Sequence, residues 1–312
     1  MFYTRTQGNE GSHAGKPSLD LHLYENAEPP SMKTTLDCIP CFFRQALFAV
    51  RAATPDEAVH KELLDRVGSL LPDIPLDSSP PEIAVRVYGA VSEVTGRTDP
   101  FQALKHESTQ KALALYSTLK HRIETSEDPL LTAVCTAIAG NVIDFGANPS
   151  FELEREIEEL LQKPLTINHF EAFQNRLQAS DWVLYLGDNA GETVFDRLLI
   201  ETMGRPAVYA VRDAPFINDA TREDAEMAGL SSVARIVSSG CKAPGTILAW
   251  CSDAFRATFR EAPLIVSKGQ GNFESLSEES GPLFHLLKVK CSVIAGVLGA
   301  PEGSFVLKQA ST

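Results

Sequence analysis

The sequence predicts an α/β protein in which a helical N-terminal region precedes a mostly parallel sheet covered by helices on both faces. Two observations support this fold class. From Cys38 to about Ser180, apolar residues recur at the three- and four-residue spacing of amphipathic helices. After Ser180, short apolar runs alternate with helix-like segments, which is the pattern of a parallel sheet with helical crossovers.

The overall composition is that of an ordinary globular protein with an acidic surface. The chain has 312 residues, of which 44% are hydrophobic and 22% are charged, and its formal net charge is -13. This charge argues against nucleic acid and anionic membranes as partners, whereas a local cation site still permits a small phosphorylated substrate. No apolar run is long enough to span a bilayer, and Met1 to Ser31 lacks the apolar centre of a secretory signal. We therefore expect a cytoplasmic protein.

Six cysteines in a chain of this length do not indicate a disulfide scaffold. Cys38 and Cys41 form the one close pair, a CxxC that fits half a zinc site, a redox pair or two incidental thiols. A structural zinc site takes four ligands, and no second CxxC or HxxxH accompanies this pair. We favour reduced thiols, with a composite site involving the scattered cysteines left open.

The N-terminal half divides into a leader and a helical region. Residues 1–31 are polar and lack periodicity, so we expect a disordered leader. The helical region is expected over residues 32–180, with starts marked by a capping side chain near proline. These starts are Thr54-Pro55-Asp56-Glu57, Ser79-Pro80-Pro81-Glu82, Asp99-Pro100 and Asp128-Pro129. The expected helices are 58–71, 83–94, 101–123, 130–143, 151–161 and 170–177.

The α/β core is expected over residues 181–312. The expected strands are 182–186, 207–211, 234–237, 264–266 and 291–298. The expected helices between them are 193–203, 221–228, 244–260 and 282–289. Right-handed crossovers put the carboxyl ends of parallel strands at one edge of the sheet, where the binding sites of such sheets form.

Polar side chains follow the first of these strands, in Gly187-Asp188-Asn189-Ala190-Gly191-Glu192. Asp188 and Asn189 offer hard oxygen donors at the carboxyl end of a buried strand, and a helix begins directly afterwards. This arrangement suits a divalent cation beside an anion. A polar turn that caps the helix is the structural alternative for the same residues.

The fourth strand ends in Lys268-Gly269-Gln270-Gly271-Asn272, which has the composition of a phosphate cradle. The lysine supplies a charge, and the glycines admit close approach of backbone N–H groups. The segment is neither a Walker A loop nor a GxGxxG motif. A glycine-rich turn with a solvated lysine is the structural alternative.

Three carboxylates, Asp213, Asp219 and Asp224, follow the second strand. Asp213 can begin a turn, and Asp224 lies one helical turn past Thr221, where it can serve the dipole of the expected helix 221–228. Asp219 is the one that we expect to reach back toward Asp188, although a simple turn would also explain it. In the helical region, Asn141 and Asp144 either cap the end of a helix or form a wall of the pocket.

Taken together, these segments resemble the metal-dependent damage-control phosphatases, a family once catalogued as domain of unknown function 89. The resemblance rests on GDNAGE at 187–192, NDAT at 218–221, KGQGN-F-E at 268–274, GN-x-ID-x-G at 140–146, KC at 290–291 and the early CxxC. That CxxC points to the branch with archaeal and bacterial members. The resemblance spans Met32 to about Leu307 and leaves out the leader.

The resemblance implies a helical region beside a Rossmann-like core, with a divalent ion held by Asp188, Asn189 and Asp219. It also implies that Lys268 holds the substrate phosphate. The further candidates for contact with the substrate are Asn141, Glu192, Gly269, Gly271 and Asn272. All-oxygen ligands suit Mg²⁺ or Mn²⁺, and Co²⁺ or Ni²⁺ can bind such a site more tightly.

The function that we expect is metal-dependent hydrolysis of the phosphomonoester of a small metabolite, such as a phosphosugar or a phosphopantetheine-like compound. Asp188 and Lys268 are the expected catalytic residues, and Glu192 or Asp144 would orient water. One rival is a non-catalytic phospho-ligand-binding or sensor protein with the CxxC as a redox switch. A second rival is a thiol oxidoreductase. The sequence does not indicate the oligomeric state.

Overall fold

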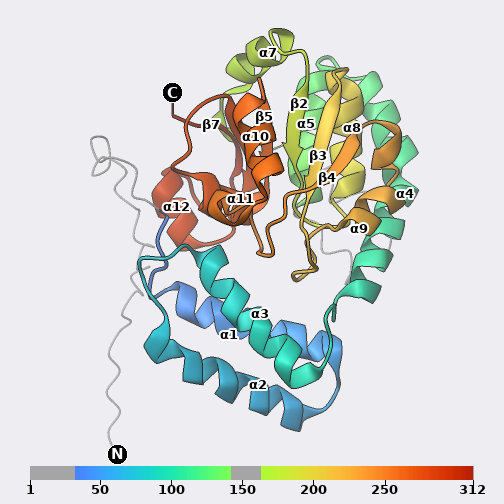
Figure 1. Cartoon of the computed structure of the whole chain (residues 1–312). Coiled ribbons are helices and arrows are strands. Elements are labelled where there is room, and N and C mark those ends of the chain that lie inside the picture. Colours follow the sequence, from blue (N-terminus) through green and yellow to red (C-terminus); the bar gives the residue numbers. More distant parts are fainter. Residues whose placement is uncertain (1–31, 142–162, 312) are drawn as a thin grey trace, which may run out of the picture.

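The computed structural model of the protein describes residues 32–141 and 163–311 (Figure 1). The expected leader, the expected helix 151–161 and Asp144 lie outside these residues. None of the helices in the two described ranges has the length and apolar character needed to cross a membrane.

A seven-stranded, mostly parallel sheet organises the described residues, with the spatial order β1-β7-β6-β5-β2-β3-β4. The β6–β7 pair is antiparallel, and the other neighbouring strands pair in parallel. The strands are β1 (Leu165–Asn168), β2 (Val183–Leu186), β3 (Ala207–Val211), β4 (Arg235–Ser238), β5 (Ile265–Lys268), β6 (Leu283–Lys288) and β7 (Phe305–Gln309). The predicted α/β fold class is thus confirmed.

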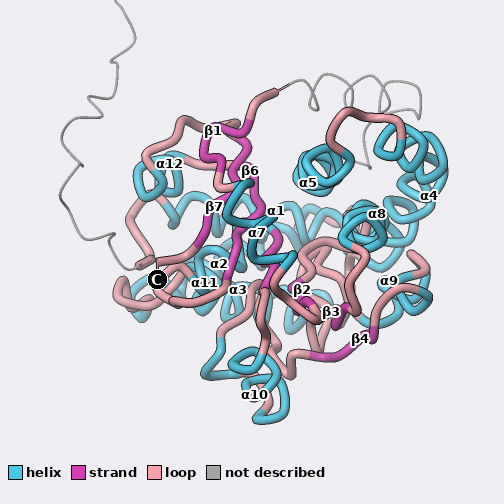
Figure 2. Tube along the Cα trace, turned by 90° about the horizontal axis from the view of Figure 1, so that it is seen from above, coloured by secondary structure: helices cyan, strands magenta, loops and turns pink. Residues whose placement is uncertain are grey.

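Helices cover both faces of the sheet, because alternate side chains of its buried strands point to opposite faces. Tyr185 of β2 belongs to a core shared with α5 (Pro129–Gly140) and α8 (Thr193–Met203). Leu184 and Leu186 belong to a core shared with α10 (Asp253–Glu261) and α11 (Gly269–Leu276). Figure 2 shows α5 and α8 on one side of the strands and α10 on the other. The helices are α1 (Cys38–Ala53), α2 (Glu57–Leu70), α3 (Pro80–Thr95), α4 (Gln102–Glu124), α5 (Pro129–Gly140), α7 (Phe170–Gln178), α8 (Thr193–Met203), α9 (Arg222–Met227), α10 (Asp253–Glu261), α11 (Gly269–Leu276) and α12 (Ser292–Leu298).

The chain changes direction across the sheet between β2 and β5. From β2 it proceeds to β3 and β4, and it then crosses back to β5 on the other side of β2. A reversal of this kind opens a crevice at the carboxyl ends of the two strands. Asp188 follows β2 and Lys268 ends β5, so both stand at this crevice.

Helices α1, α2 and α3 form a separate layer, called here the helical cap, which lies below the sheet in Figure 1. The cap has its own apolar core, and Phe216 and Ile217 of the β3–α9 connection pack against that core. A capping box of Ser79 and Glu82 begins α3, at the helix start that the sequence predicts. Helix α2 is capped by Asp56, whose side chain accepts a hydrogen bond from the Ala58 N–H.

Two neighbouring segments have the opposite structure from the one that the sequence predicts. Residues 282–289, expected as a helix, form β6, and residues 291–298, expected as a strand, form α12. The apolar residues of β6 are buried on both faces, so the alternation that marks a half-exposed strand is absent. In α12, β-branched residues favour a strand, but the surrounding packing decides.

The prediction also missed the strands at one edge of the sheet. Residues 165–168, expected within the helical region, form β1, which pairs with the unforeseen β7. Strand β1 has only four residues, which is too short for its alternation to stand out. Of the expected helix 244–260, only the part from Asp253 onward is an α-helix. This part is α10, and Ser252 caps it.

Candidate active site

The connections after β2 and β3 are joined by backbone hydrogen bonds, which bring Asp188 and Asp219 together. The Ala220 N–H donates to the Asp188 carbonyl at 2.7 Å, and the Ala190 N–H donates to the Asn218 carbonyl at 2.8 Å. Asn189 and Asp219 form an antiparallel bridge in the same place. The structure therefore brings together the three residues, Asp188, Asn189 and Asp219, that the resemblance assigns to an ion.

The two other carboxylates after β3 have structural partners instead. Asp213 is exposed and accepts a hydrogen bond from Ser238 Oγ at 2.6 Å. Asp224 closes a capping box with Thr221 and forms an ion pair with Lys105 Nζ at 3.1 Å. Of the three carboxylates, Asp219 is thus the one beside Asp188, as the sequence predicts.

Two side-chain amides hold the Asp188 carboxylate. Asn141 Nδ2 donates to Asp188 Oδ2 at 2.8 Å, and Asn189 Nδ2 donates to the same oxygen at 3.1 Å. Both amides also donate to Glu192 Oε1. Asn141 is the C-cap residue of α5, so the end of this helix places its side chain in the site.

Each of the three expected ion ligands keeps one oxygen without a hydrogen bond from the described residues. These atoms are Asp188 Oδ1, Asn189 Oδ1 and Asp219 Oδ1. Nearby, Asn141 Oδ1 is buried and has no partner among the described residues either. Oxygens that lack a hydrogen-bond donor fit a hard cation. No group of three Asp, Glu, His or Cys side chains in the described ranges is arranged to hold an ion, so amide oxygens would have to complete the ligand set.

The buried charges around these oxygens do not balance. Four carboxylates face two cations, which leaves two formal negative charges; the groups are Asp188, Glu192, Asp196 and Asp219 against Arg212 and Lys268. Burial and the charges of Glu192 and Asp219 raise the pKa of Asp188 to about 8. A divalent cation at this place would offset that excess.

Lys268 lies inside the protein and not on a cavity wall. Its side chain is 0% exposed, and Nζ donates to Glu192 Oε2 at 2.9 Å and to Asp196 Oδ1 at 2.8 Å. Burial alone would lower the pKa of Lys268, but the charges of Asp196 and Glu192 outweigh it and hold the pKa above its usual range. The resemblance assigns Lys268 to the substrate phosphate, whereas in this structure its charge meets two carboxylates.

Asn272 is also turned inward. Its Nδ2 donates to the carbonyls of Gly187 and Lys268 at 3.0 and 2.8 Å, which ties together the ends of β2 and β5. Its Oδ1 accepts from Arg212 Nη2 at 3.2 Å and from Thr246 Oγ1 at 2.8 Å. Both polar atoms of the Asn272 side chain are thus bonded inside the protein, although Asn272 was expected to contact the substrate.

The two glycines of the KGQGN segment have different surroundings. Gly269 has φ +80°, and a Cβ there would overlap the Asp188 carboxylate, so only glycine fits. A Cβ at Gly271 would lie 3.0 Å from the Pro244 carbonyl oxygen. The glycines were expected to admit a phosphate, whereas the space beside the Gly269 Cα is filled by the Asp188 carboxylate.

A cavity of about 600 Å³, called here the edge cavity, lies between the helical cap and the carboxyl edge of the sheet. Of the expected site residues, Asp188, Asn189, Asp219 and Gly271 line it. Glu192, Lys268 and Asn272 are buried behind its wall. Cys38 and Cys41 of α1, together with Cys291, line the same cavity and are free thiols.

Two charged residues of the edge cavity were not among the expected site residues. Lys290 is exposed in it, and its backbone N–H donates to Gln270 Oε1 at 3.1 Å. Glu274 lines it too, and burial raises the pKa of Glu274 to about 7 against the opposing hydrogen bond from Gln270. Both belong to motifs that carry the resemblance, which was the signal available for them.

Two buried residues behind the cavity were missed as well. Arg212 Nε donates to Asp219 Oδ2 at 2.7 Å, and Asp196 accepts hydrogen bonds from Lys268, Tyr185 and Tyr209. The signal for Asp196 was an acidic residue among the apolar positions of α8, where burial demands partners.

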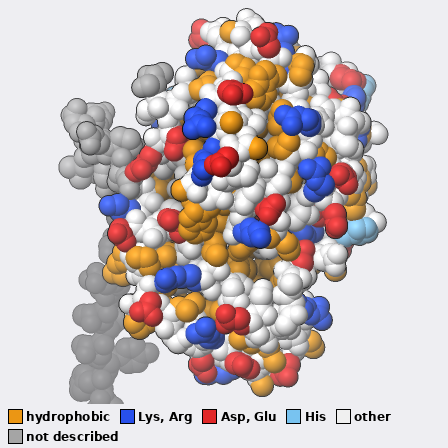
Figure 3. All heavy atoms as spheres, in the orientation of Figure 1, with side chains coloured by type: hydrophobic (Ala, Val, Ile, Leu, Met, Phe, Trp, Pro, Cys, Tyr) orange, Lys and Arg blue, Asp and Glu red, His pale blue; other side chains and the backbone are white. Residues whose placement is uncertain are grey.

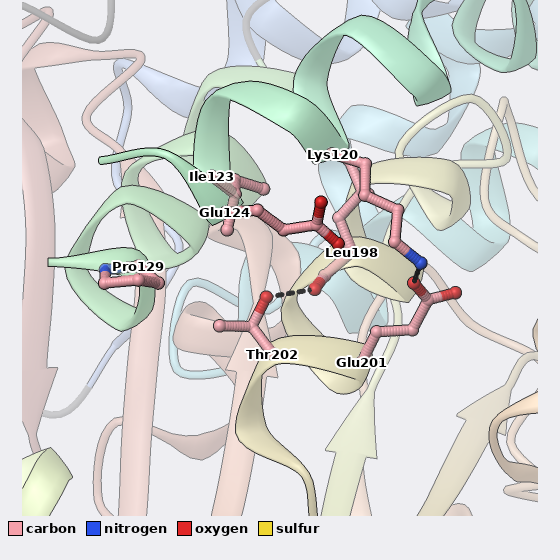
Figure 4. Close-up of a pocket in the computed structure, with 7 residues that line it drawn as sticks. All are labelled: Lys120, Ile123, Glu124, Pro129, Leu198, Glu201 and Thr202. Carbon is pink, nitrogen blue, oxygen red and sulfur yellow. Dashed lines mark hydrogen bonds and ion pairs between the residues drawn. The ribbon is translucent and has the colours of Figure 1, made fainter. Parts of the chain in front are cut away.

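A second, smaller cavity of about 220 Å³ lies between α4, α5 and α8 (Figure 4). Lys120 Nζ forms an ion pair with Glu201 there at 2.7 Å. None of the expected site residues lines it, and none lines a further cavity of about 460 Å³ between α4, α5 and β1. The edge cavity is therefore the candidate active site.

Known proteins are similar to this chain in sequence and in fold. Residues 34–306 match the family described as the damage-control phosphatase ARMT1-like domain. The chain is 34% identical over 282 residues to damage-control phosphatase PH1575 of Pyrococcus horikoshii, covering 88% of this chain and 97% of that protein. It is 33% identical over 290 residues to a damage-control phosphatase of Archaeoglobus fulgidus, covering 89% of this chain and 99% of that protein.

A solved structure of the Pyrococcus horikoshii protein, described as a DUF89 family protein, has the same fold. It matches with a TM-score of 0.83 and 31% identity, covering 89% of this chain and 99% of that chain. The resemblance drawn from the motifs is therefore confirmed, and the chain belongs to the family of damage-control phosphatases with an ARMT1-like domain.

Proposed function

We propose that this protein is a divalent-metal-dependent phosphatase acting in metabolite damage control. Its substrate would be the phosphomonoester of a small metabolite, such as a phosphosugar or a phosphopantetheine-like compound. The observation that carries the proposal is that Asp188, Asn189 and Asp219 line the edge cavity and each keep one oxygen without a hydrogen bond from the described residues. Membership of a phosphatase family supports the same activity.

Asp188, Asn189 and Asp219 would hold the ion. Two carboxylates and an amide form an all-oxygen set that suits Mg²⁺ or Mn²⁺, with Co²⁺ or Ni²⁺ as tighter competitors. When bound, the ion neutralises charge on the phosphoryl oxygens and lowers the pKa of a coordinated water. Arg212 fixes Asp219 from behind, and the amides of Asn141 and Asn189 fix Asp188.

The substrate phosphate would bind between Lys290 and the first turn of α11. Lys290 is an exposed cation of the edge cavity, and its backbone is joined to Gln270 in that first turn. Gly271 of the same turn lines the cavity. A helix N-terminus offers free N–H groups to an anion, and a lysine adds a charge.

Glu274 would supply the proton that the leaving group needs. Its carboxyl group lines the edge cavity, and Gln270 Nε2 donates to its Oε1 at 2.8 Å. A pKa raised to about 7 lets this group hold a proton near neutral pH and release it to an alkoxide oxygen.

A second candidate function is a phospho-ligand-binding or sensor protein whose thiols respond to oxidants. The observation that favours it is the place of Cys38 and Cys41 on the wall of the edge cavity. Turnover separates the two candidates, because a sensor binds the phosphorylated ligand without hydrolysing it.

The test is a panel of phosphosugars and phosphopantetheine derivatives, assayed for release of inorganic phosphate with Mn²⁺ and with EDTA. We expect one class to be hydrolysed with Mn²⁺ and none with EDTA. Binding of a panel member without phosphate release would favour the sensor, and hydrolysis that persists in EDTA would contradict the metal site.

A further inference from the structure

Asp196 is a buried carboxylate that the proposed mechanism does not use. It stands on α8, one helical turn after Glu192, and its side chain is 0% exposed. Tyr185 donates to its Oδ1 and Tyr209 to its Oδ2, both at 2.7 Å, and Lys268 Nζ donates to Oδ1 at 2.8 Å. Three hydrogen-bond donors therefore hold this buried carboxylate in one position.

The two tyrosines are held in place by the sheet. Tyr185 of β2 and Tyr209 of β3 are paired in register on neighbouring strands, and their rings stack with centroids 5.4 Å apart. Both side chains are fully buried. A Cβ at Gly187 would overlap the Tyr209 side chain, so the glycine of GDNAGE makes room for this pair.

Lys268 connects this group to the ion site. Its Nζ bridges Asp196 Oδ1 and Glu192 Oε2, and Glu192 Oε1 accepts from the two amides that hold Asp188. A continuous path of hydrogen bonds thus runs from the tyrosine pair to Asp188. Moving any member would change where Glu192 and the amides lie.

The same geometry leaves Lys268 poorly placed to bind a phosphate. Its side chain is 0% exposed, whereas Lys290 is exposed in the edge cavity. A lysine moved from two buried carboxylates to a substrate would leave both of them without a counter-charge, which is costly in the protein interior.

We propose that Asp196, held by Tyr185 and Tyr209, is a positioning residue that fixes Lys268 against Glu192, and that Lys268 acts on the ion site through Glu192 and not on the substrate phosphate. The kinetic part of this inference rests on the proposed phosphatase function.

The first test measures phosphate binding directly. Inorganic phosphate is titrated by calorimetry into the parent, Lys268→Met and Lys290→Met, each loaded with Mn²⁺. We expect Lys268→Met to bind phosphate within about twofold of the parent, and Lys290→Met to lose roughly tenfold or more. Loss of phosphate affinity in Lys268→Met with Mn²⁺ affinity intact would overturn the inference.

The second test is a cycle of Lys268→Met and Asp196→Asn. Lys268→Met alone should lower the melting temperature, because Glu192 and Asp196 lose their shared cation. Adding Asp196→Asn should restore part of it and cost no further kcat, since Asp196 acts through Lys268. Additive losses of kcat in the double variant would contradict a path through Lys268.

The third test uses a substitution that keeps the fold. Tyr209→Phe removes one hydrogen bond to Asp196, and we expect kcat to fall roughly tenfold while KM changes little. The matched control is Tyr116→Phe, because Tyr116 donates to Glu201, another carboxylate of α8, at 2.7 Å and outside the site. In the control the melting temperature should fall without a change in kcat.

Unchanged kcat in Tyr209→Phe would overturn the inference by showing that Asp196 is only structural. The proposed function fails in a different way, since a parent protein that hydrolyses no member of the phosphometabolite panel contradicts it before any variant is made.

Discussion

Arg212 Nε donates to Asp219 Oδ2 at 2.7 Å, and the two side chains are only 2% and 6% exposed. The guanidinium also reaches Thr246 and Asn272, at 3.2 Å each. One planar donor thus fixes an expected ion ligand to the segment that follows β5. Arg212 therefore connects the expected ion site directly to the first turn of α11, which follows β5.

Arg212→Lys keeps the charge but loses the fork that joins Asp219 to Asn272. We expect Mn²⁺ affinity to fall about tenfold, as for other residues that orient metal ligands, and measure it by calorimetry. Arg205→Lys is the control, because within residues 32–141 and 163–311 Arg205 donates only to the Leu177 and Gln178 carbonyls. Equal Mn²⁺ affinity in the two variants would show that Arg212 does not orient Asp219.

Gly269→Ala should disable the ion site, because the new Cβ would overlap the Asp188 carboxylate at a backbone φ of +80°. We expect a lower melting temperature and loss of Mn²⁺ binding. Gly89→Ala in α3 is the matched control, since a Cβ there meets nothing within 4 Å. That change should raise the free energy of unfolding by about 0.5–1 kcal/mol. Normal Mn²⁺ binding by Gly269→Ala would refute the close packing.

Cys38→Ser combined with Cys41→Ser should leave turnover largely intact, because no proposed step uses a thiolate. The two thiols line the edge cavity, so a modest rise in KM is compatible with the proposal. Steady-state kinetics before and after hydrogen peroxide treatment measure the effect. A folded double variant that has lost turnover would bring the CxxC into the mechanism.

Glu274→Gln should change how stability depends on pH. Burial raises the pKa of Glu274 from 4.5 to about 7, so the native state holds this proton more tightly than the unfolded chain. The free energy of unfolding of the parent should therefore fall as the pH rises from 4.5 to 7 through this group. Glu274→Gln removes that loss, so we expect a gain over the parent of about 1–3 kcal/mol at pH 8 that is absent at pH 4.5.

Urea denaturation at the two pH values decides this prediction. The same variant should also lose the decline in kcat above pH 7 that a general acid produces. A parent whose kcat shows no such decline would remove Glu274 from proton transfer.

The sequence predicted best where a pattern determines the structure locally. The helix 193–203 matches α8 because its apolar residues have helical spacing, and residues 207–211 match β3 because they form a short continuous apolar run. Within residues 282–298, a helix was expected where β6 forms and a strand was expected where α12 forms. Their apolar runs suit a helix and a strand equally, and only pairing with β5 and β7 decides that β6 is a strand.

The sequence predicted where the site lies better than it predicted what each residue of the site does. The meeting of Asp188 and Asp219 follows from parallel strand ends, which the sequence predicts. The inward direction of Lys268 does not, because it depends on Asp196 and on the tyrosine pair across two strands. Asp196 needed the packing of α8 on the sheet before its three partners could be identified.

The ion site at Asp188, Asn189 and Asp219 is tested most directly by calorimetric titration of Mn²⁺ into chelator-treated protein, with phosphate release assayed in the same samples. We predict that the parent binds Mn²⁺ and gains turnover with it, and that Asp219→Ala does neither. Asp224→Ala should bind Mn²⁺ normally and lose only the cap and the Lys105 ion pair, about 1–3 kcal/mol of stability. Normal Mn²⁺ binding and turnover in Asp219→Ala would contradict the site.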